Sequence, residues 1–485
     1  MEIELICPTC RQPLSPAASA WGCPQAGDGK EHILQKVVKE LALDQSDVQK
    51  DWQQTRDAFY TFRKLLGSHS LLLDEQFCEI LQSQQANLEQ YEQRRFVGTP
   101  LRKSDQLAAS IGQTGQIWLK DETNNVTGSH KGRHLFGTLL YLESWRAKHH
   151  RSDKSVLAIY SCGNAALGAA AVARAGGYEL HTYVPAELDP VVDAMLEERG
   201  ALVEKVSRDC IGEGDPCYLA FKQALSKGWL PFACSGTDNW SNIEGGETLA
   251  WEMIMQLKEQ QANVDHLAMQ VGGGALARAI SQGWQELYQA GVVDYLPRFH
   301  ACQPEGGFPF VRAYHLVLAH LAQMTGLEYD LSDDSSLEPG LQIERLKLFI
   351  REHEEQIQAA SSYAREHFDS AIMTECLSFV RENRSDFMWA WDGEAPYSLA
   401  HGILDDETYD WYPLLLMMLK TGGRAVIINE PVIKQAYEIG QSKTGIQVAP
   451  TGSAGLAGLL VLQGLGVVRP EDSVGLFFTG IERIQ

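Results

Sequence analysis

The sequence predicts an α/β fold built on two doubly wound, mainly parallel sheets. From Val97 onward, short runs rich in β-branched residues alternate with alanine-rich segments of helical period. This alternation is typical of successive β-α-β units. The 485 residues, 44% of them hydrophobic, suffice for two or three domains with sizeable cores. The expected strands are residues 117–120, 156–160, 180–184, 202–206, 267–271 and 425–429.

The segments between and around these strands indicate how the chain is divided. We expect a Cys-containing arm over residues 1–30 and a helical extension, rich in Gln, Leu and charge, over residues 31–95. Residues 96–155 and 233–485 should form a large domain, and residues 156–232 a smaller, mobile one. A charged, helix-prone insertion at about 312–394 has an amphipathic pattern that favours a packed face or a subunit contact.

The charge balance restricts the classes of partner. The chain carries 41 basic and 63 acidic residues, a net charge of −22, which repels nucleic acid and anionic membranes. Its first residues lack a basic region before an apolar run, and no stretch of about eighteen apolar residues occurs. We therefore expect a cytoplasmic protein that acts on a small molecule. We also expect a homo-oligomer, with a dimer as the leading form, although these observations do not fix the oligomeric state.

Lys131 is the first candidate site residue. It lies in the segment Thr-Gly-Ser-His-Lys-Gly-Arg-His at residues 127–134, soon after the apolar segment 115–120. A lysine at the mouth of a folded site can lose its proton and condense with an aldehyde, whereas a lysine on a solvated helix face stays protonated. Most lysines are surface charges, so the assignment depends on the segments around it.

A loop that follows the expected strand 156–160 is suited to bind a carboxylate. It leads directly into an alanine-rich helix, whose first N–H groups point at any anion beyond the strand end. The residues expected to bind this anion are Ser161, Gly163, Asn164 and Ala165.

Two further strand ends complete the set of ligand groups. Three consecutive glycines let the backbone approach a phosphate closely after strand 267–271, and Thr479 ends an apolar run as a possible partner for a ring nitrogen. Each feature alone also occurs in ordinary turns and strand ends. Together, an aldehyde, a phosphate and a ring nitrogen describe pyridoxal 5'-phosphate. The phosphate loop consists of Gly272, Gly273, Gly274, Ala275 and Leu276.

The order of these segments resembles the fold-type II pyridoxal phosphate enzymes, and within them the threonine synthase-like group. Lys-Asp-Glu-Thr at residues 120–123, followed by residues 127–133, is similar to the group's Lys-Asp-Glu-Thr and Thr-Gly-Ser-Phe-Lys-Asp-Arg. Segments 96–101, 242–248 and 447–457 are also similar to family motifs. The resemblance covers about residues 96–310 and 395–485.

The chemistry of the cofactor, the resemblance and nearness in the sequence together suggest a role for each candidate. Lys131 would hold the cofactor and then move the α-proton of the substrate, while Asn164 would touch the 3-oxygen of the ring and Thr479 the ring nitrogen. His130 would face the phosphate or carry a second proton. Arg133, with His130 and His134 nearby, would clamp a phosphoryl group of the substrate.

Departures from the family pattern leave the substrate open. His130 stands where threonine synthases carry phenylalanine, Gly132 replaces an aspartate, and residues 272–276 replace Gly-Asn-Ala-Gly-Asn. The leading expectation is a lyase that converts O-phosphohomoserine to threonine. The alternatives are a serine or threonine ammonia-lyase, a β-replacing enzyme, and, in another class, a regulatory or scaffold protein that binds the cofactor.

The cysteine pattern predicts reduced thiols, because ten cysteines are scattered along the chain without a disulfide framework. Cys7, Cys10 and Cys23 resemble half of a zinc ribbon. A second Cys-x-x-Cys would need cysteine at Ala26, so the fourth ligand is missing unless His32 substitutes. This pattern favours a remnant knuckle without metal, and metal binding is the alternative.

Overall fold

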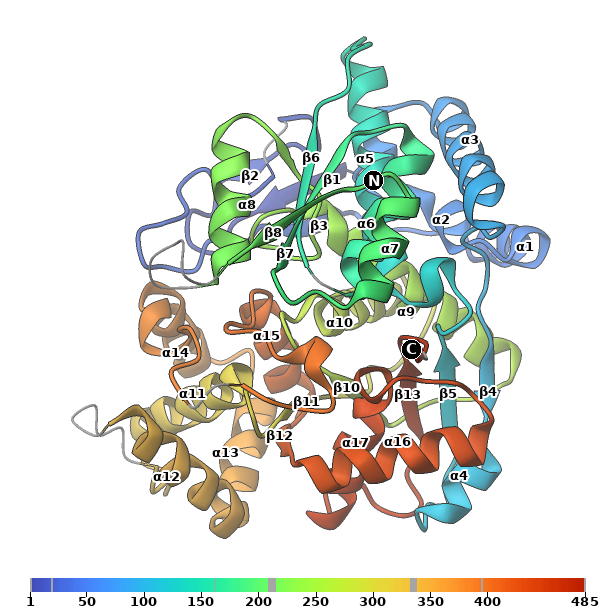
Figure 1. Cartoon of the computed structure of the whole chain (residues 1–485). Coiled ribbons are helices and arrows are strands. Elements are labelled where there is room, and N and C mark those ends of the chain that lie inside the picture. Colours follow the sequence, from blue (N-terminus) through green and yellow to red (C-terminus); the bar gives the residue numbers. More distant parts are fainter. Residues whose placement is uncertain are drawn as a thin grey trace.

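Two parallel sheets organise the chain and confirm the predicted fold class. The computed structural model describes residues 2–18, 21–161, 163–207, 215–331, 338–393 and 396–483. The larger sheet has the order β12-β11-β10-β13-β5-β4 and is parallel except at β4 (Figure 1). Its strands are β4 (Leu101–Lys103), β5 (Ile117–Asp121), β10 (His266–Gln270), β11 (Arg298–Pro304), β12 (Ala425–Ile428) and β13 (Val474–Phe478).

Both faces of this sheet are buried, which explains why its strands read as continuous apolar runs. In β5, Ile117 and Leu119 join the apolar cluster on one face, whereas Trp118 joins the cluster on the other, as the two-residue period of a strand requires. The first face is covered by α4 (Asp105–Ser110), α16 (Glu430–Thr444) and α17 (Pro450–Gly464). The second is covered by α5 (Lys131–Lys148), α9 (Ser241–Glu259) and α10 (Ala275–Gln289).

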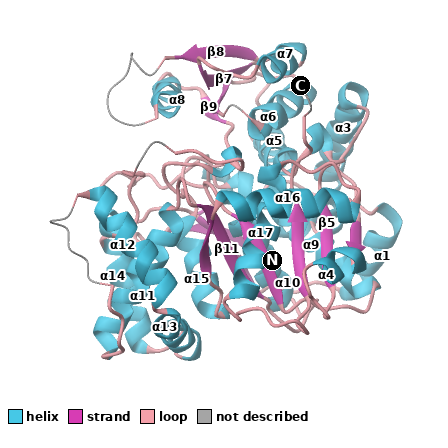
Figure 2. Cartoon of the chain, turned by 60° about the horizontal axis from the view of Figure 1, so that its bottom comes forward, coloured by secondary structure: helices cyan, strands magenta, loops and turns pink. Residues whose placement is uncertain are grey.

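The smaller sheet has the order β8-β7-β6-β9 and is parallel throughout. Figure 2 shows it as a layer apart from the larger sheet. Its strands are β6 (Leu157–Tyr160), β7 (Leu180–Pro185), β8 (Leu202–Val206) and β9 (Leu230–Pro231), and its helices are α6 (Asn164–Gly176), α7 (Pro190–Glu198) and α8 (Pro216–Ser226).

The N-terminal region forms a third, antiparallel sheet of order β2-β1-β3. Its strands are β1 (Glu2–Ile6), β2 (Pro13–Leu14) and β3 (Gln35–Lys39), and a 3-10 turn, η1 (Pro16–Ala18), follows β2. The helical extension expected from residue 31 is therefore wrong at its start, because residues 35–39 pair with β1 and the β-branched Val37 and Val38 suit a strand better than a helix. Helices follow only at α1 (Gln45–Thr55), α2 (Ala58–Thr61) and α3 (Asp74–Glu92), with 3-10 turns η2 (Arg63–Leu65) and η3 (His69–Leu71) between α2 and α3.

A group of helices packs beside the β12 edge of the larger sheet (Figure 1). It comprises α11 (Pro309–Thr325), α12 (Pro339–Glu352), α13 (Glu354–Glu366), α14 (Ala371–Glu382) and α15 (Trp411–Thr421), with 3-10 turns η6 (Arg384–Asp386) and η7 (His401–Ile403). Within the described ranges, none of the helices combines the length and the apolar content that a membrane crossing requires.

Candidate functional site

The adjacent parallel strands β5 and β13 bring Lys131 and Thr479 together. After β5 the chain turns through η4 (Val126–Gly128), where Thr127 and Gly128 both have left-handed backbone angles, with φ of 56° and 70°. His130 N then donates to Thr479 O at 3.0 Å, and a β-bridge joins Ser129 to Gly480. Lys131, the first residue of α5, is consequently held beside the end of β13, and its side chain is partly exposed.

The Thr479 hydroxyl is oriented by a residue that the sequence analysis missed. Gln270, the last residue of β10, donates from Nε2 to Thr479 Oγ1 at 2.8 Å. Because this bond occupies an acceptor site of the hydroxyl, the O–H of Thr479 stays available to donate to another group. A polar residue that ends a buried strand two positions before the glycine loop was the signal that could have identified Gln270.

His130 is held as a neutral imidazole next to Lys131. Burial, together with the positive charges of Lys131 and Arg133, lowers the pKa of His130 to about 3. Its Nδ1 lies 3.1 Å from Thr479 O and must donate there, because a carbonyl oxygen can only accept. Nε2 is buried and has no hydrogen-bond partner within the described residues. The free lone pair at Nε2 is suited to accept a hydrogen bond and unsuited to contact a phosphate.

The glycine loop forms a cradle that only glycine can line. A Cβ at Gly272 would lie 2.2 Å from Asp405 Oδ2, one at Gly273 would lie 2.9 Å from a ring carbon of Tyr409, and one at Gly274 would lie 2.9 Å from Thr408 Cγ2. Gly274, with φ of 94°, directly precedes α10, whose N-terminus is not capped by a side chain of the described residues. Backbone N–H groups at such a helix start are suited to bind a phosphate, so the residues present fit the cofactor's phosphate group.

A carboxylate already contacts this cradle. The N–H of Gly273 donates to Asp405, and burial raises the pKa of Asp405 to about 6, although Lys131 and this hydrogen bond partly oppose the increase. Asp405 therefore lies where the cofactor phosphate is expected. Its carboxylate carries a charge of the same sign as a phosphate.

The predicted carboxylate loop lies at the start of α6, at the edge of the smaller sheet. Gly163 precedes the helix, and no described side chain caps its N-terminus. Asn164 Oδ1 accepts a hydrogen bond from Arg483 Nη1 at 2.6 Å, while Arg483 Nη2 donates to Thr127 O at 2.8 Å. Arg483 thus joins α6 to the turn that leads to Lys131. Ser161 Oγ accepts weakly from Gly163 N at 3.4 Å, and residue 162 lies outside the described residues.

Arg483 is a second residue that the sequence analysis missed. Its side chain is partly exposed, and it forms no ion pair with any residue that the structure describes. A guanidinium has five N–H donors, and the two recorded bonds go to uncharged oxygens. In a chain of net charge −22, an arginine without a carboxylate partner at a helix N-terminus is suited to bind an anionic ligand.

The expected role of Arg133 in clamping a substrate phosphoryl group is wrong. Arg133 is fully buried, with Nε 2.8 Å from Glu122 Oε2 and Nη2 3.0 Å from Glu252 Oε2. These two carboxylates occupy its charged end inside the protein. His134 is likewise buried, with Nδ1 2.9 Å from the backbone oxygen of Asn242. Neither side chain is free to bind substrate.

Three tyrosines connect the smaller sheet to the glycine cradle. Tyr160 ends β6, Tyr218 lies on α8, and Tyr409 contacts Gly273. The ring centroids of Tyr409 lie 6.2 Å from Tyr160 and 5.9 Å from Tyr218, and the centroids of Tyr160 and Tyr218 are 4.9 Å apart. This aromatic contact spans the two sheets beside the candidate site.

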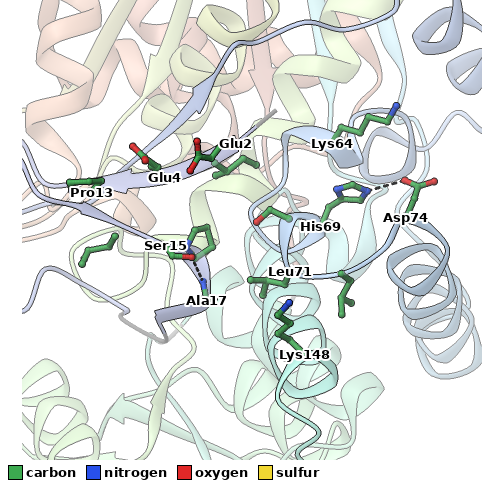
Figure 3. Close-up of a pocket in the computed structure, with 15 residues that line it drawn as sticks. Glu2, Glu4, Pro13, Ser15, Ala17, Lys64, His69, Leu71, Asp74 and Lys148 are labelled. Carbon is green, nitrogen blue, oxygen red and sulfur yellow. Dashed lines mark hydrogen bonds and ion pairs between the residues drawn. The ribbon is translucent and has the colours of Figure 1, made fainter.

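Two hollows in the described part of the chain lie away from Lys131. One, of about 650 Å³, lies between the N-terminal sheet, η3 and α3 (Figure 3). Its polar side chains include His69 and Asp74, which pair with each other at 2.9 Å. The other, of about 1170 Å³, lies near Asn263, Arg298 and Asp472. Neither hollow contains a residue of the predicted cofactor site.

Comparison with protein families and with known sequences identifies relatives of the chain. The family described as "Pyridoxal-phosphate dependent enzyme" matches residues 93–363, more than half of the chain. A threonine synthase of Methanosarcina acetivorans is 29% identical over 220 residues, which cover 44% of this chain and 50% of the relative. A threonine synthase of Methanocaldococcus jannaschii is 27% identical over 220 residues, 45% of this chain and 50% of the relative. The chain thus spans about half the length of the curated relatives it matches.

Comparison with solved structures supports the fold. The T.th. threonine deaminase has a TM-score of 0.54 at 17% identity, over 84% of this chain and 99% of that one. Maize serine racemase has a TM-score of 0.55 at 14% identity, over 84% and 93% of the two chains.

Proposed function

Because the chain belongs to the family of pyridoxal-phosphate dependent enzymes, we propose that it is a lyase that eliminates or replaces a group at the β or γ carbon of an amino acid. Pyridoxal phosphate, when bound, supplies an electron sink for the electrons that remain at the α carbon after a proton leaves. The observation that carries the proposal is the adjacency of Lys131, the Thr479 hydroxyl and the uncapped helix start at Asn164.

Each of these groups has a separate task in the proposed reaction. The Lys131 amine would hold the cofactor, and it would also serve as the base for the α-proton of the substrate. The first N–H groups of α6 hold the substrate carboxylate, and those of the glycine cradle hold the cofactor phosphate. His130, neutral and adjacent, offers the lone pair of Nε2 as a hydrogen-bond acceptor to a bound ligand.

The Thr479 hydroxyl favours elimination over transamination. Gln270 donates to Thr479 Oγ1 at 2.8 Å, so the hydroxyl can donate its own proton to the cofactor's ring nitrogen. A neutral hydroxyl does not stabilise a full positive charge on that nitrogen, whereas an aspartate partner would. With the cofactor bound, its electron sink would be weaker as a result, which would favour loss of a leaving group over transamination.

The leading substrate in this proposal is O-phosphohomoserine, converted to threonine. The threonine synthase relatives support this choice. A phosphorylated substrate needs a cation, and since Arg133 and His134 are engaged in the interior, we assign this contact to Arg483. Charge-assisted hydrogen bonds of this kind contribute about 1.5–3 kcal/mol each.

A serine or threonine ammonia-lyase is the second candidate, because the likeness to threonine deaminase covers 99% of that chain. For such a substrate, Arg483 would contact the α-carboxylate at the start of α6. A third candidate, from another class, is a cofactor-binding regulatory or scaffold protein, for which the helices α11–α14 beside the sheet would serve as a partner surface.

Product analysis separates these candidates. The purified holoprotein is incubated with O-phosphohomoserine, serine, threonine and sulfur-containing amino acids, and phosphate, ammonia, keto acids and new amino acids are quantified. Threonine and phosphate formation supports the leading proposal, whereas ammonia and keto acid from hydroxy amino acids replaces it with the lyase alternative. A coloured holoprotein that is inert on every substrate favours the regulatory or scaffold protein.

The roles of Lys131 and Arg483 are tested by substitution. Borohydride reduction and peptide mapping should find the pyridoxyl group on Lys131, and the Lys131→Ala variant should fold and lack turnover; a label on another lysine overturns the assignment. Arg483→Gln should raise KM for O-phosphohomoserine roughly ten- to a hundredfold. Arg102→Gln, on an exposed arginine of β4, is the matched control and should leave KM unchanged.

A further inference from the structure

Four metal-binding side chains meet in the N-terminal sheet. The ligand atoms of Cys7, Cys10, Cys23 and His32 all lie within 4.8 Å of one another. His32 Nδ1 is 3.4 Å from Cys7 Sγ, 3.5 Å from Cys10 Sγ and 3.4 Å from Cys23 Sγ. Cys10 Sγ and Cys23 Sγ are 3.7 Å apart. Cys7 and Cys10 are close in the sequence, whereas the fold brings Cys23 and His32 to them from 13 and 22 positions beyond Cys10.

These spacings are those of a tetrahedral metal site. With Zn–S bonds of about 2.3 Å and a Zn–N bond of about 2.0 Å, a regular tetrahedron places the sulfurs about 3.8 Å from each other and about 3.5 Å from the nitrogen. The observed distances of 3.7 Å and 3.4–3.5 Å agree with both values. A disulfide would need a sulfur separation of about 2.05 Å.

Hydrogen bonds alone do not satisfy this cluster. His32 Nε2 lies 2.9 Å from Asp28 Oδ1, so this nitrogen carries the proton and Nδ1 has a single lone pair. One lone pair accepts from one thiol, although three sulfurs surround it. A carboxylate on the remote nitrogen is also the arrangement that orients metal-binding histidines, and Cys10 N donates to Cys7 Sγ at 3.4 Å, as in Cys-x-x-Cys metal knuckles.

We propose that Cys7, Cys10, Cys23 and His32 bind one Zn²⁺ in a closed structural site, with Asp28 orienting the histidine. Binding of Zn²⁺ here would replace the expected knuckle without metal, because the fold places His32 beside the three cysteines where the sequence lacks a second Cys-x-x-Cys. Four protein ligands leave no open coordination position, so the metal supports the fold and takes no part in the reaction. The proposal does not rest on the proposed function.

The residues that follow His32 connect this site to the cofactor cradle. Leu34 O accepts from Arg278 Nη2 at 2.6 Å, and Arg278 Nη1 pairs with Asp410 Oδ1 at 2.8 Å. Asp410 N in turn donates to Gly273 O at 2.8 Å. On the other side of His32, Glu31 accepts from Trp411 Nε1 at 2.6 Å. A metal that holds His32 thus holds the segment that supports the glycine loop.

Metal content of the full-length holoprotein is the direct test. Protein expressed with added zinc and passed over a desalting column should contain one equivalent of Zn²⁺ per chain by elemental analysis. Cys10→Ser and His32→Ala should each lose at least four fifths of it. Cys78→Ser, at a thiol outside the cluster, is the matched control and should keep the full equivalent. A parent protein without zinc, or ligand variants that retain it, would overturn the proposal.

Two measurements on the parent protein keep the test decisive if the variants do not fold. An organomercurial reagent should release one equivalent of Zn²⁺ to a chromogenic chelator. Exchange with Co²⁺ should give the intense visible bands of tetrahedral thiolate coordination, and failure of both signals refutes the site. Zinc-depleted protein should also release pyridoxal phosphate at least fivefold faster, and unchanged release would refute the connection through Leu34 and Arg278.

Discussion

Replacing Lys36 by methionine should destabilise the chain in a pH-dependent way. Lys36, on β3, is buried with three carboxyl groups. It forms an ion pair with Glu247, and its Nζ lies 3.0 Å from Glu286 Oε1 and 3.9 Å from Glu244 Oε1. Lys36 Nζ also donates a hydrogen bond to Leu65 O at 2.9 Å. Although burial lowers the pKa of Lys36, the surrounding carboxylates outweigh it and raise that pKa above its usual value. Lys36 therefore stays charged and neutralises the cluster.

The carboxyl groups set the pH dependence. Burial raises the pKa of Glu244 to about 7 and that of Glu286 to about 8, while the charge of Lys36 partly opposes both shifts. The folded chain binds more protons here than the unfolded chain, whose glutamates titrate near pH 4.5. The cluster's contribution to stability is present in full below pH 4.5 and is lost as the pH rises towards 8. Lys36→Met removes the cation that contacts all three carboxyl groups and steepens that loss.

The size of the expected loss in unfolding free energy depends on the carboxylate charge that stays buried after Lys36 is removed. Removing one partner of a buried ion pair costs about 3–5 kcal/mol. We expect about 4 kcal/mol at pH 8, where the carboxyl groups must ionise without a partner. At pH 5 Glu244 and Glu286 are protonated, so fewer buried charges lose their partner, and we expect a smaller loss of about 1 kcal/mol, the cost of the lost hydrogen bonds. Adding Glu247→Gln should recover about half of the loss at pH 8, because one uncompensated charge is removed.

Urea unfolding of the full chain at pH 5 and pH 8, followed by tryptophan fluorescence, measures these values. Trp251 is a suitable probe, since Lys36 Nζ lies 5.3 Å from its ring. Lys39→Met is the matched control: Lys39 is exposed, pairs with Glu4 on the same sheet, and should change stability by less than about 0.5 kcal/mol. An equal loss at both pH values, or a loss below about 1 kcal/mol at pH 8, would contradict the assigned charges.

Three further substitutions test the site. Gly273→Ala should weaken pyridoxal phosphate binding at least tenfold in equilibrium dialysis, because its Cβ would lie 2.9 Å from Tyr409. Gly464→Ala is the control and should leave binding unchanged, because its Cβ would meet nothing within 4 Å. Equal affinities of the two variants would show that the glycine loop is only structural. Asp405→Asn should tighten cofactor binding severalfold above pH 6, because the parent carboxylate is ionised there and repels the phosphate. A fluorescence titration of the cofactor measures this affinity. No gain in affinity would mean that Asp405 leaves the loop in the holoprotein. Arg133→Met should lower the stability of the chain by about 3–5 kcal/mol, because Glu122 and Glu252 stay buried without their partner; a change in substrate KM without loss of stability would restore the substrate role that we have withdrawn.

The sequence by itself predicted the features that local pattern determines. The parallel strands follow from β-branched runs between helical segments, since burial on both faces of a sheet needs continuous apolar stretches. Lys131, the three glycines and Thr479 could be selected because each directly follows such a run, and parallel strands place their carboxyl ends at one edge of a sheet. Their chemical roles stay predictions until the experiments above are made.

Contacts between distant segments were decided only by the tertiary structure. Arg133 has the residue type of an anion clamp, yet its charge is neutralised by Glu252, 119 positions away. Arg483 and Gln270 lie at the site because strands and helices far apart in the chain end together. A charged side chain interacts with whatever partner the fold buries beside it, and that partner has no fixed spacing in the sequence.

The N-terminal region shows most clearly which features the sequence determines and which only the tertiary structure decides. Cys7 and Cys10 are recognisable as a metal knuckle from their spacing alone, because two ligands in one tight turn form a local pattern. His32 became the fourth ligand only through the pairing of β3 with β1, which also turned an expected helix into a strand. Local spacing thus determined half of this site, and long-range strand pairing determined the rest. The spacing could not show this pairing, because its energy comes from backbone hydrogen bonds that any sequence can form.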